Sequence, residues 1–408
     1  MRLLSNLLTK FVRKGTLRFY DADGQLHVFG GKEPGPASTV RMHDAALEKK
    51  LFANPELYAA EAYMDGKLTF EEGSGVHDFI LLFSVNRQAL YTYGSQKVIH
   101  KVWRALRRWH QANPVGTAAK NARHHYDVSS ELYQLFLDKQ MQYSCAYFRD
   151  PENETLEQAQ QNKLIHATTK LQLKPGMTVA EIGSGWGGFA IHIARETGAH
   201  VTAINVSPEQ LKVSRQRAEE AGVADLIDFR EVDYRNLEGQ FDRVVSVGMM
   251  EHVGIGHFDE YFGKVRALLK EDGYAFIHCI GRMKVPGTTG PFIRKYIFPG
   301  AYVPSLSEVF AAIERNGLWL ADNEILRLHY YYTVQHWRKR FAANREEAKR
   351  IYDERFCRMW EWYLSAVELE FLHGSHMVFQ LLLAKTREAV PITRDFMIDA
   401  ERAAHAKT

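Results

Sequence analysis

Four glycines follow a short apolar segment that contains one acid. The segment Val179-Ala180-Glu181-Ile182 leads into Gly183, Gly185, Gly187 and Gly188. Glycine permits positive φ, and its missing side chain lets a ligand approach the backbone closely. A strand, a glycine turn and a helix start in this order are typical of nucleotide and nucleoside sites. The spacing of Gly183, Gly185 and Gly188 also satisfies the dinucleotide pattern G-x-G-x-x-G.

Glu181 argues against a dinucleotide. A carboxylate at this strand end faces the helix N-terminus where a pyrophosphate would sit, and the two anions would repel each other. The acid suits a cationic sulfonium ligand that carries an amino group. Nicotinamide enzymes also have an acid about 20 residues later, where this chain has the amide Asn205. The remaining alternative is a glycine turn that only links a strand to a helix.

A second acid, Asp233, follows the third strand of the predicted sheet. A carboxylate at this place could accept a hydrogen bond from an adenine amino group. Taken alone, it is equally typical of a helix N-cap. Both interpretations of Asp233 stay open from the sequence.

The elements that must hold these residues alternate from about Lys174 onward. Strands that alternate with helices predict a mostly parallel sheet covered on both faces. Residues 1–110 predict instead a small α+β domain, and residues after 332 predict helices packed on the larger sheet. The strands predicted for the larger sheet are 177–182, 200–205, 227–232, 241–248 and 274–279, with helices at 189–197, 208–221 and 261–269.

The length of 408 residues allows two or three separately packed domains. We expect an N-terminal, lipid- or membrane-associated domain at 1–110, a linker at 111–124 and a catalytic domain at 125–408. The linker prediction rests on Asn113-Pro114-Val115-Gly116 and its small polar neighbours. Three cysteines fit reduced thiols in a cytoplasm better than a disulfide framework.

Two basic amphipathic segments, 1–14 and 97–110, carry apolar residues at helical spacing. Such helices can lie in an anionic membrane interface. They can equally pack an apolar face on a core and expose a charged one, and the sequence leaves both alternatives open. No apolar run approaches the roughly 20 residues that span a bilayer. We therefore expect a cytoplasmic protein that works on membranes, if at all, from their surface.

Several further motifs, in this order along the chain, carry a resemblance to a known family. They are Tyr143–Phe148, Ser246–Gly254, Ile277–Gly281, Lys295–Gly300 and His329-Tyr330. Together they resemble the cyclopropane-fatty-acyl-phospholipid synthase family, which includes the mycolic acid cyclopropane synthases. The resemblance runs from about His125 to the C-terminus, and residues 1–110 resemble the extra N-terminal domain of the phospholipid-acting members.

The resemblance implies a Rossmann-like class I methyltransferase domain, with a seven-stranded, mostly parallel sheet in which one strand is reversed. It implies that S-adenosyl-L-methionine is the cofactor and that a bicarbonate ion is bound. The implied cofactor contacts are Tyr143, Ser144, Glu181, Gly183, Ser184, Gly185, Gly187, Asn205, Gln210, Asp233 and Tyr234. The implied bicarbonate contacts are Cys145, Glu251, His278, Ile280 and Tyr330. Many family members carry cysteine at Ser184 and aspartate at Glu181, and both changes preserve size or charge.

This chemistry accounts for the residue types. An alkene must be desolvated and aligned with the sulfonium methyl group, and the resulting cation closes to a ring when a nearby base removes a proton. A thiolate nucleophile at Cys145 is not needed. The expected substrates are unsaturated membrane phospholipids, with no nucleic acid, and two-domain relatives suggest a homodimer. Alternatives are a methyl-branching enzyme of the same family, a small-molecule or nucleic-acid methyltransferase, and a lipid-binding scaffold.

Overall fold

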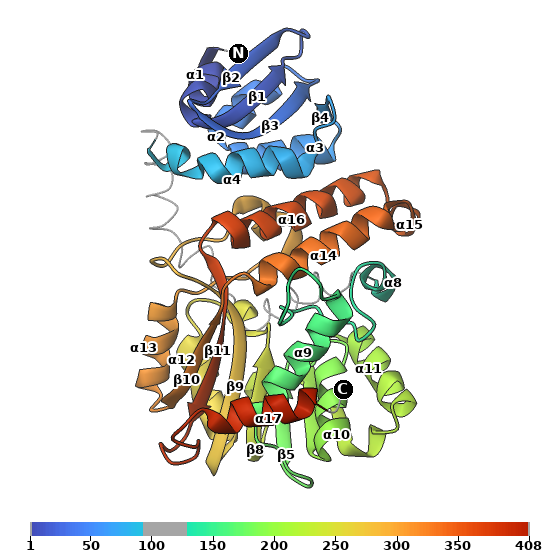
Figure 1. The fold of residues 1–408 in the computed structure, drawn as a ribbon, viewed down its shortest axis with the longest axis vertical. Coiled ribbons are helices and arrows are strands. Elements are labelled where there is room, and N and C mark those ends of the chain that lie inside the picture. Colours follow the sequence, from blue (N-terminus) through green and yellow to red (C-terminus); the bar gives the residue numbers. More distant parts are fainter. Residues whose placement is uncertain (1, 93–128, 407–408) are drawn as a thin grey trace. The chain divides into compact units, whose positions relative to one another are not determined.

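The computed structural model describes residues 2–92 and 129–406 (Figure 1). Contacts divide the chain into two compact units. Unit 1 combines the N-terminal part of the chain with residues 288–298 and 334–375, and unit 2 contains the rest. The predicted basic segment 97–110, the linker 111–124 and the start of the predicted catalytic domain lie outside the described residues. The predicted domain boundaries therefore stay a prediction.

Unit 1 contains a four-stranded sheet in the order β2-β1-β3-β4, in which β1 pairs parallel with β3 and antiparallel with β2. In β1, Leu17 and Phe19 point into the core while Arg18 and Tyr20 are partly exposed, as expected for a half-buried strand. The elements are α1 (Arg2–Phe11), β1 (Lys14–Tyr20), β2 (Leu26–Gly30), β3 (Glu33–Met42), α2 (Leu47–Ala53), α3 (Pro55–Met64), β4 (Leu68–Glu71), α4 (Val76–Thr92), a π-helical turn (Ile293–Ile297), α15 (Arg345–Ile351) and α16 (Glu354–His373).

Helix α1 answers the question left open for residues 1–14. Leu4, Leu7, Leu8 and Phe11 are 2–5% exposed, so the apolar stripe packs on the core of unit 1. The basic side chain of Lys10 lies on the exposed side of the same helix. For this segment the structure favours the core-facing alternative over a membrane-facing one.

Unit 2 is a seven-stranded sheet in the order β10-β11-β9-β8-β5-β6-β7. Strand β11 runs antiparallel to both of its neighbours, and the pairs among β5 to β9 are parallel. The predicted fold, with one reversed strand, is confirmed. The strands are β5 (Thr178–Ile182), β6 (His200–Asn205), β7 (Ile227–Glu231), β8 (Phe241–Val247), β9 (Leu269–Arg282), β10 (Trp319–Leu326) and β11 (His376–Ala384).

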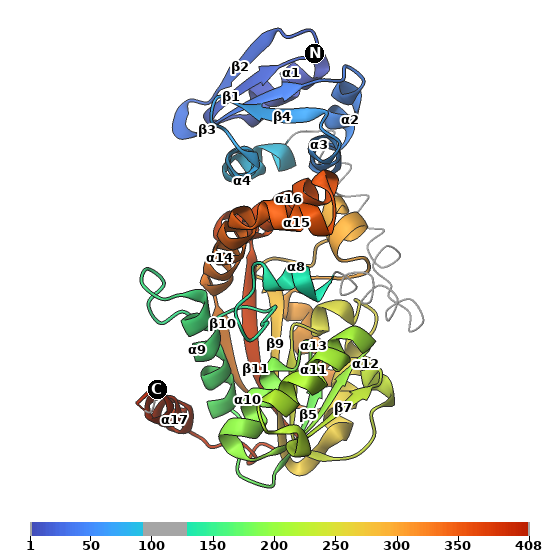
Figure 2. The ribbon, with the colours of Figure 1, turned by 90° about the vertical axis from the view of Figure 1, so that its right-hand side faces the viewer.

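Helices cover both faces of this sheet, as Figure 2 also shows. The helices of unit 2 are α8 (Ser130–Gln134), α9 (Leu156–Thr169), α10 (Gly188–Thr197), α11 (Pro208–Glu220), α12 (Phe258–Leu268), α13 (Leu306–Arg315) and α17 (Asp395–His405), and α14 (His329–Ala343) runs on into unit 1. Short 3-10 turns lie at Ala224–Leu226, Tyr234–Asn236 and Met250–His252. One core joins the sheet to α12 and α13, and a second joins it to α9, α10, α11 and α17.

The alternation of side chains along the strands assigns each residue to one of these cores. In β9, Ala275 and Ile277 face α12 and α13, whereas Tyr274 and Phe276 face the side of α9. His278, two residues after Phe276, therefore also belongs to the α9 side. Across the described ranges, no helix combines the length and apolar character needed to cross a membrane.

Candidate functional site

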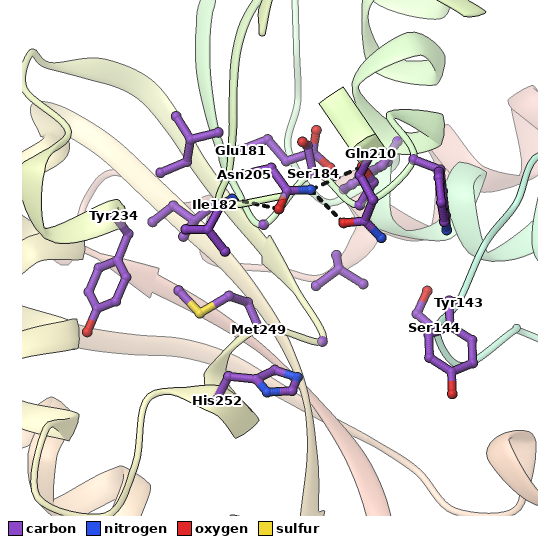
Figure 3. Close-up of a pocket in the computed structure, with 18 of the residues that line it drawn as sticks. Tyr143, Ser144, Glu181, Ile182, Ser184, Asn205, Gln210, Tyr234, Met249 and His252 are labelled. Carbon is purple, nitrogen blue, oxygen red and sulfur yellow. Dashed lines mark hydrogen bonds between the residues drawn. The ribbon is translucent and has the colours of Figure 1, made fainter. Parts of the chain in front are cut away.

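A pocket in unit 2 opens where β5, β6 and β8 end (Figure 3). This is the edge at which open α/β sheets bind ligands. In Figure 3, Tyr143 and Ser144 lie on one side of the pocket and Tyr234 on the other. Ten of the eleven predicted cofactor contacts line it: Tyr143, Ser144, Glu181, Gly183, Ser184, Gly185, Asn205, Gln210, Asp233 and Tyr234.

The exception is Gly187, which lies in the turn next to Ser214. Its φ is +77°, and a Cβ atom there would lie 2.8 Å from Cβ of Ser214. Gly183 and Ser184 both donate their backbone N–H groups to the carbonyl of Ile204, at 3.0 Å each. The glycine turn is thus fastened to β6, and its left-handed residues leave the backbone accessible to a ligand.

Asn205 connects the turn to the following helix. Its Nδ2 donates to Oε1 of Gln210 at 2.8 Å and to the carbonyl of Gly185 at 3.2 Å (Figure 3). Its Oδ1 accepts from the backbone N–H of Val206 at 2.7 Å. Every polar atom of the Asn205 amide group is therefore engaged in holding the pocket wall in place, which an acid at this position would not do in the same way.

Asp233 satisfies the N-cap interpretation and lines the pocket as well. Its Oδ1 accepts from the backbone N–H of Arg235 at 3.0 Å, which caps a short 3-10 turn. The Arg235 guanidinium also donates to both carboxylate oxygens, at 2.8 and 2.6 Å. Burial alone would raise the pKa of Asp233, but Arg235 outweighs it and lowers that pKa. Asp233 is thus held as an oriented acceptor.

Glu181 lies 3% exposed in the pocket wall, and its Oε2 has no hydrogen-bond partner among residues 2–92 and 129–406. Burial raises the pKa of Glu181 to about 8, and the neighbouring Lys163 opposes this rise. A buried acceptor without a partner is costly, and a cationic ligand in the pocket would supply the missing donor or charge.

Lys163 also belongs to this site, although it was not predicted from the sequence. Its Nζ donates to Oγ of Ser144 at 3.2 Å and to Oε1 of Gln142, two groups that line the pocket. Burial lowers the pKa of Lys163 to about 8, with Asp138 and Glu181 opposing. A signal was present, because Lys163 and Lys170 share helical spacing with the buried residues of α9. His252 also lines the pocket.

The five predicted bicarbonate contacts do not line this pocket. Oε1 of Glu251 accepts from the backbone N–H of Ile280 at 2.7 Å, so two of the five are in direct contact. Oε2 of Glu251 is buried without a partner among the residues that the structure describes. Burial raises the pKa of Glu251 to about 7, opposed by the Ile280 N–H group. The neighbouring Cys279 thiol lies 3.1 Å from the carbonyl of Ile280, and its proximity to Glu251 also opposes the rise in the pKa of Glu251.

His278 precedes Ile280 by two residues on β9 and is 2% exposed. Its Nδ1 lies 3.2 Å from Nε2 of Gln380 on β11. Burial lowers the pKa of His278 to about 3, and the nearby Lys163 and Lys170 add to the effect. His278 is therefore neutral at physiological pH.

Cys145 and Tyr330 belong to two segments joined by hydrogen bonds. The N–H of Ala146 donates to Oγ1 of Thr333 at 3.0 Å, and the N–H of Phe148 donates to Nδ1 of His329 at 3.0 Å. The Cys145 thiol is fully buried and donates to the carbonyl of Ala146 at 3.3 Å. Burial raises the pKa of Cys145 far above its usual range, which argues against a thiolate nucleophile.

The sheet order and the pocket define a class I, S-adenosylmethionine-dependent methyltransferase. Residues 115–381 match the family model described as mycolic acid cyclopropane synthetase, and the chain belongs to that family.

Three relatives document the match. The chain is 37% identical over 375 residues to a probable fatty acid methyltransferase of Pseudomonas putida, covering 89% of this chain and 92% of the relative. It is 40% identical over 263 residues to the cyclopropane-fatty-acyl-phospholipid synthase of Escherichia coli K12, covering 64% and 67%. Mycolic acid cyclopropane synthase CmaA1, solved with SAH and CTAB, superposes with a TM-score of 0.62 at 28% identity, covering 67% of this chain and 99% of that one.

Proposed function

We propose that this enzyme converts cis double bonds of unsaturated phospholipid acyl chains into cyclopropane rings, with S-adenosyl-L-methionine as the methyl donor and bicarbonate as the base. The observation that carries the proposal is the Glu251 carboxylate. One of its oxygens is fixed by Ile280, and the other is a buried acceptor without a partner in the described chain.

The residues around Glu251 fit a bicarbonate ion. Oε2 can accept the hydroxyl proton of such an ion, and His278 is neutral and has an imidazole N–H to offer it. When bound, bicarbonate would supply a weak base next to the cation without adding to it. Cys145, Ile280 and Tyr330 would complete the contacts through their backbone and hydroxyl groups.

The chain positions the two reactants and excludes water. The glycine turn, Asn205 and Gln210 shape the cofactor pocket, and Glu181 faces the cationic part of the ligand. The alkene carbon takes the methyl group from the sulfonium, and the positive charge passes to the second alkene carbon. Loss of one proton from the new methyl group then closes the three-membered ring.

The second candidate is a methyl-branched or methylene-bearing acyl chain. One relative, which aligns with this chain over 92% of its own length, is named a probable fatty acid methyltransferase. The same transfer would occur, but the cation would lose its proton elsewhere or undergo a hydride shift first. The proposed Glu251 contact to the base favours the ring.

We also propose that the substrate is reached from a membrane surface and that two chains associate. The basic residues of segment 97–110 support surface binding through attraction to anionic lipids. Charge reversal of Arg104, Arg107 and Arg108 should weaken binding to anionic vesicles, and sedimentation with such vesicles measures it.

The deciding experiment uses the full chain, S-adenosylmethionine and vesicles of a mono-unsaturated phospholipid. Mass spectrometry and proton NMR then analyse the released acyl chains. High-field cyclopropane protons would support the proposal. Branched-methyl or retained vinyl signals would support the second candidate instead, and the absence of any lipid product would overturn both.

A further inference from the structure

A line of polar groups leads from Lys170 to His278 inside the α9-side core of unit 2. Gln380 and His278 are register partners on the antiparallel strands β11 and β9. Gln380 is 1% exposed; its Oε1 accepts from Nζ of Lys170 at 2.6 Å, and its Nε2 lies 3.2 Å from Nδ1 of His278. The oxygen and the nitrogen of the Gln380 amide thus connect Lys170 with His278.

The direction of these hydrogen bonds follows from the chemistry of the groups. A lysine ammonium group has donors and no acceptor, so the amide oxygen of Gln380 must face Lys170. The amide NH₂ group then faces His278, and because it can only donate, Nδ1 must be the acceptor. A neutral imidazole has one N–H group. If Nδ1 is bare, the proton lies on Nε2.

Glu324 stabilises the positive charge of Lys170. Its Nζ pairs with Oε2 of Glu324 at 2.5 Å, and the same oxygen accepts from Nε2 of His166 at 2.8 Å. Burial lowers the pKa of Lys170, and Glu324 opposes that effect. The ion pair thus fixes the amide orientation of Gln380, which in turn fixes the tautomer of His278.

We propose that Lys170 and Gln380 are positioning residues that hold His278 as an Nε2–H donor to the bound base. This rests on the proposed function, because it takes His278 as a contact of the bicarbonate ion. A donor at Nε2 would hold an oxygen of the anion, whereas a bare Nε2 would repel it.

Nitrogen NMR of protein with ¹⁵N-labelled histidine tests the tautomer directly, and His278→Gln identifies the signals. The wild type should show a protonated Nε2 and a bare Nδ1. Gln380→Glu preserves size and the contact to Lys170 but places an acceptor against Nδ1, so the proton should move to Nδ1. Turnover should then fall on the order of 10²-fold, with the KM for S-adenosylmethionine unchanged.

Lys170→Gln serves as a second variant, because a neutral amide no longer dictates the orientation of Gln380 and both tautomers of His278 should appear. Gln216→Glu, an amide-to-acid change on the exposed face of α11, is the matched control and should leave turnover and His278 signals as in the wild type. A wild-type His278 protonated on Nδ1 would overturn the proposal, as would an unchanged tautomer and turnover in Gln380→Glu.

Failure of the proposed function is visible separately. If the wild type forms a branched chain or no lipid product, the ring assignment fails, while the NMR signals of His278 still report whether Lys170 and Gln380 set its tautomer. If Gln380→Glu does not fold, the wild-type tautomer and the Lys170→Gln spectrum decide the matter.

Discussion

The Glu251 carboxylate accepts from the backbone N–H of Ile280 through one oxygen, at 2.7 Å, and buries the other oxygen without a partner in the described part of the chain. The first contact fixes the side chain next to β9. The second oxygen is then an oriented acceptor whose desolvation is already complete, which is how a preorganised site differs from a solvated acid.

Glu251→Gln should abolish most turnover while leaving cofactor binding intact. The amide can still accept from Ile280, but it presents N–H donors where the carboxylate presents an acceptor. We expect a fall of about 10²- to 10⁴-fold, the range for loss of general-base catalysis, because bicarbonate would lose the acceptor that holds it. Turnover comes from the NMR assay and affinity from calorimetry with S-adenosylhomocysteine. Glu260→Gln, on the exposed face of α12, is the control, and full activity of Glu251→Gln would remove Glu251 from the site.

Lys163→Met should weaken cofactor binding by about 10- to 100-fold, which corresponds to roughly 1.5–3 kcal/mol for a hydrogen bond to a charged group. Methionine preserves most of the side-chain volume but removes the donor to Ser144 and the cation near Glu181. Calorimetric titration measures the loss, and Lys212→Met on the exposed side of α11 is the control. Equal affinities of the two variants would reduce Lys163 to a packing role.

The regular part of unit 2 was predictable because each element repeats one simple pattern. Strand 200–205 and the helix that starts at Pro208 have the predicted bounds or nearly so. Strand β9 was underestimated, since it starts at Leu269 rather than 274, where Lys270, Glu271 and Asp272 gave no apolar alternation. The cofactor loop was predictable because glycines at this spacing, between a strand and a helix, are typical of a turn that binds a ligand.

Contacts between distant segments were not predictable from local pattern. Lys170 and Gln380 are 210 residues apart, and nothing in either segment shows that the amide is a register partner of His278. Likewise, the sequence could not decide whether the apolar stripe of α1 faces a core or a membrane, because the two environments select the same residues. Only the surrounding residues of unit 1 distinguish them.

Gly187→Ala should destabilise the protein and impair cofactor binding more than Gly176→Ala does. Both glycines have a left-handed φ, +77° and +81°, so both substitutions should incur about 1 kcal/mol of backbone strain. Only at Gly187 would the new Cβ also collide, with Ser214, whereas nothing lies within 4 Å at Gly176. We expect an additional loss of about 1–3 kcal/mol there. Denaturant unfolding and calorimetry compare the stability and the cofactor affinity of the two variants. Equal losses in both variants would mean that the turn accommodates the new Cβ atom at Gly187 without strain from Ser214.

Cofactor affinity should rise with pH between about 6 and 7.5, the range below the raised pKa of Glu181. Burial holds that pKa at about 8, so most Glu181 is protonated at pH 7 in the free protein. A cationic ligand favours the carboxylate, and binding must therefore release a proton. The slope should approach tenfold per pH unit for one proton. Glu181→Gln should flatten it, and an equally steep profile in that variant would assign the titration to another group such as Lys163.

Glu324→Gln should destabilise unit 2 by about 3 kcal/mol near pH 6, because it leaves the buried Lys170 without its ion-pair partner. Burial would raise the pKa of Glu324, but hydrogen bonds and charge from His166 and Lys170 hold it well below its usual range. A depressed pKa contributes stability that is present above the unfolded value of about 4.3 and is lost as the pH falls.

The partner His166 titrates with the opposite sign. Burial would lower the pKa of His166, but Glu324 and Glu401 raise it. The contribution of His166 to the free energy of unfolding is therefore fully present below its unfolded pKa of about 6.5. This contribution is lost as the pH rises through the raised pKa of the folded protein. The difference in the free energy of unfolding between the wild type and Glu324→Gln should thus be largest at about pH 5–6.5 and decrease in acid. Unfolding in denaturant at several pH values measures it. Asp228→Asn, which breaks an exposed pair with Arg230, should cost less than about 1 kcal/mol; equal losses at both sites would mean that the Glu324 pair is solvated in solution.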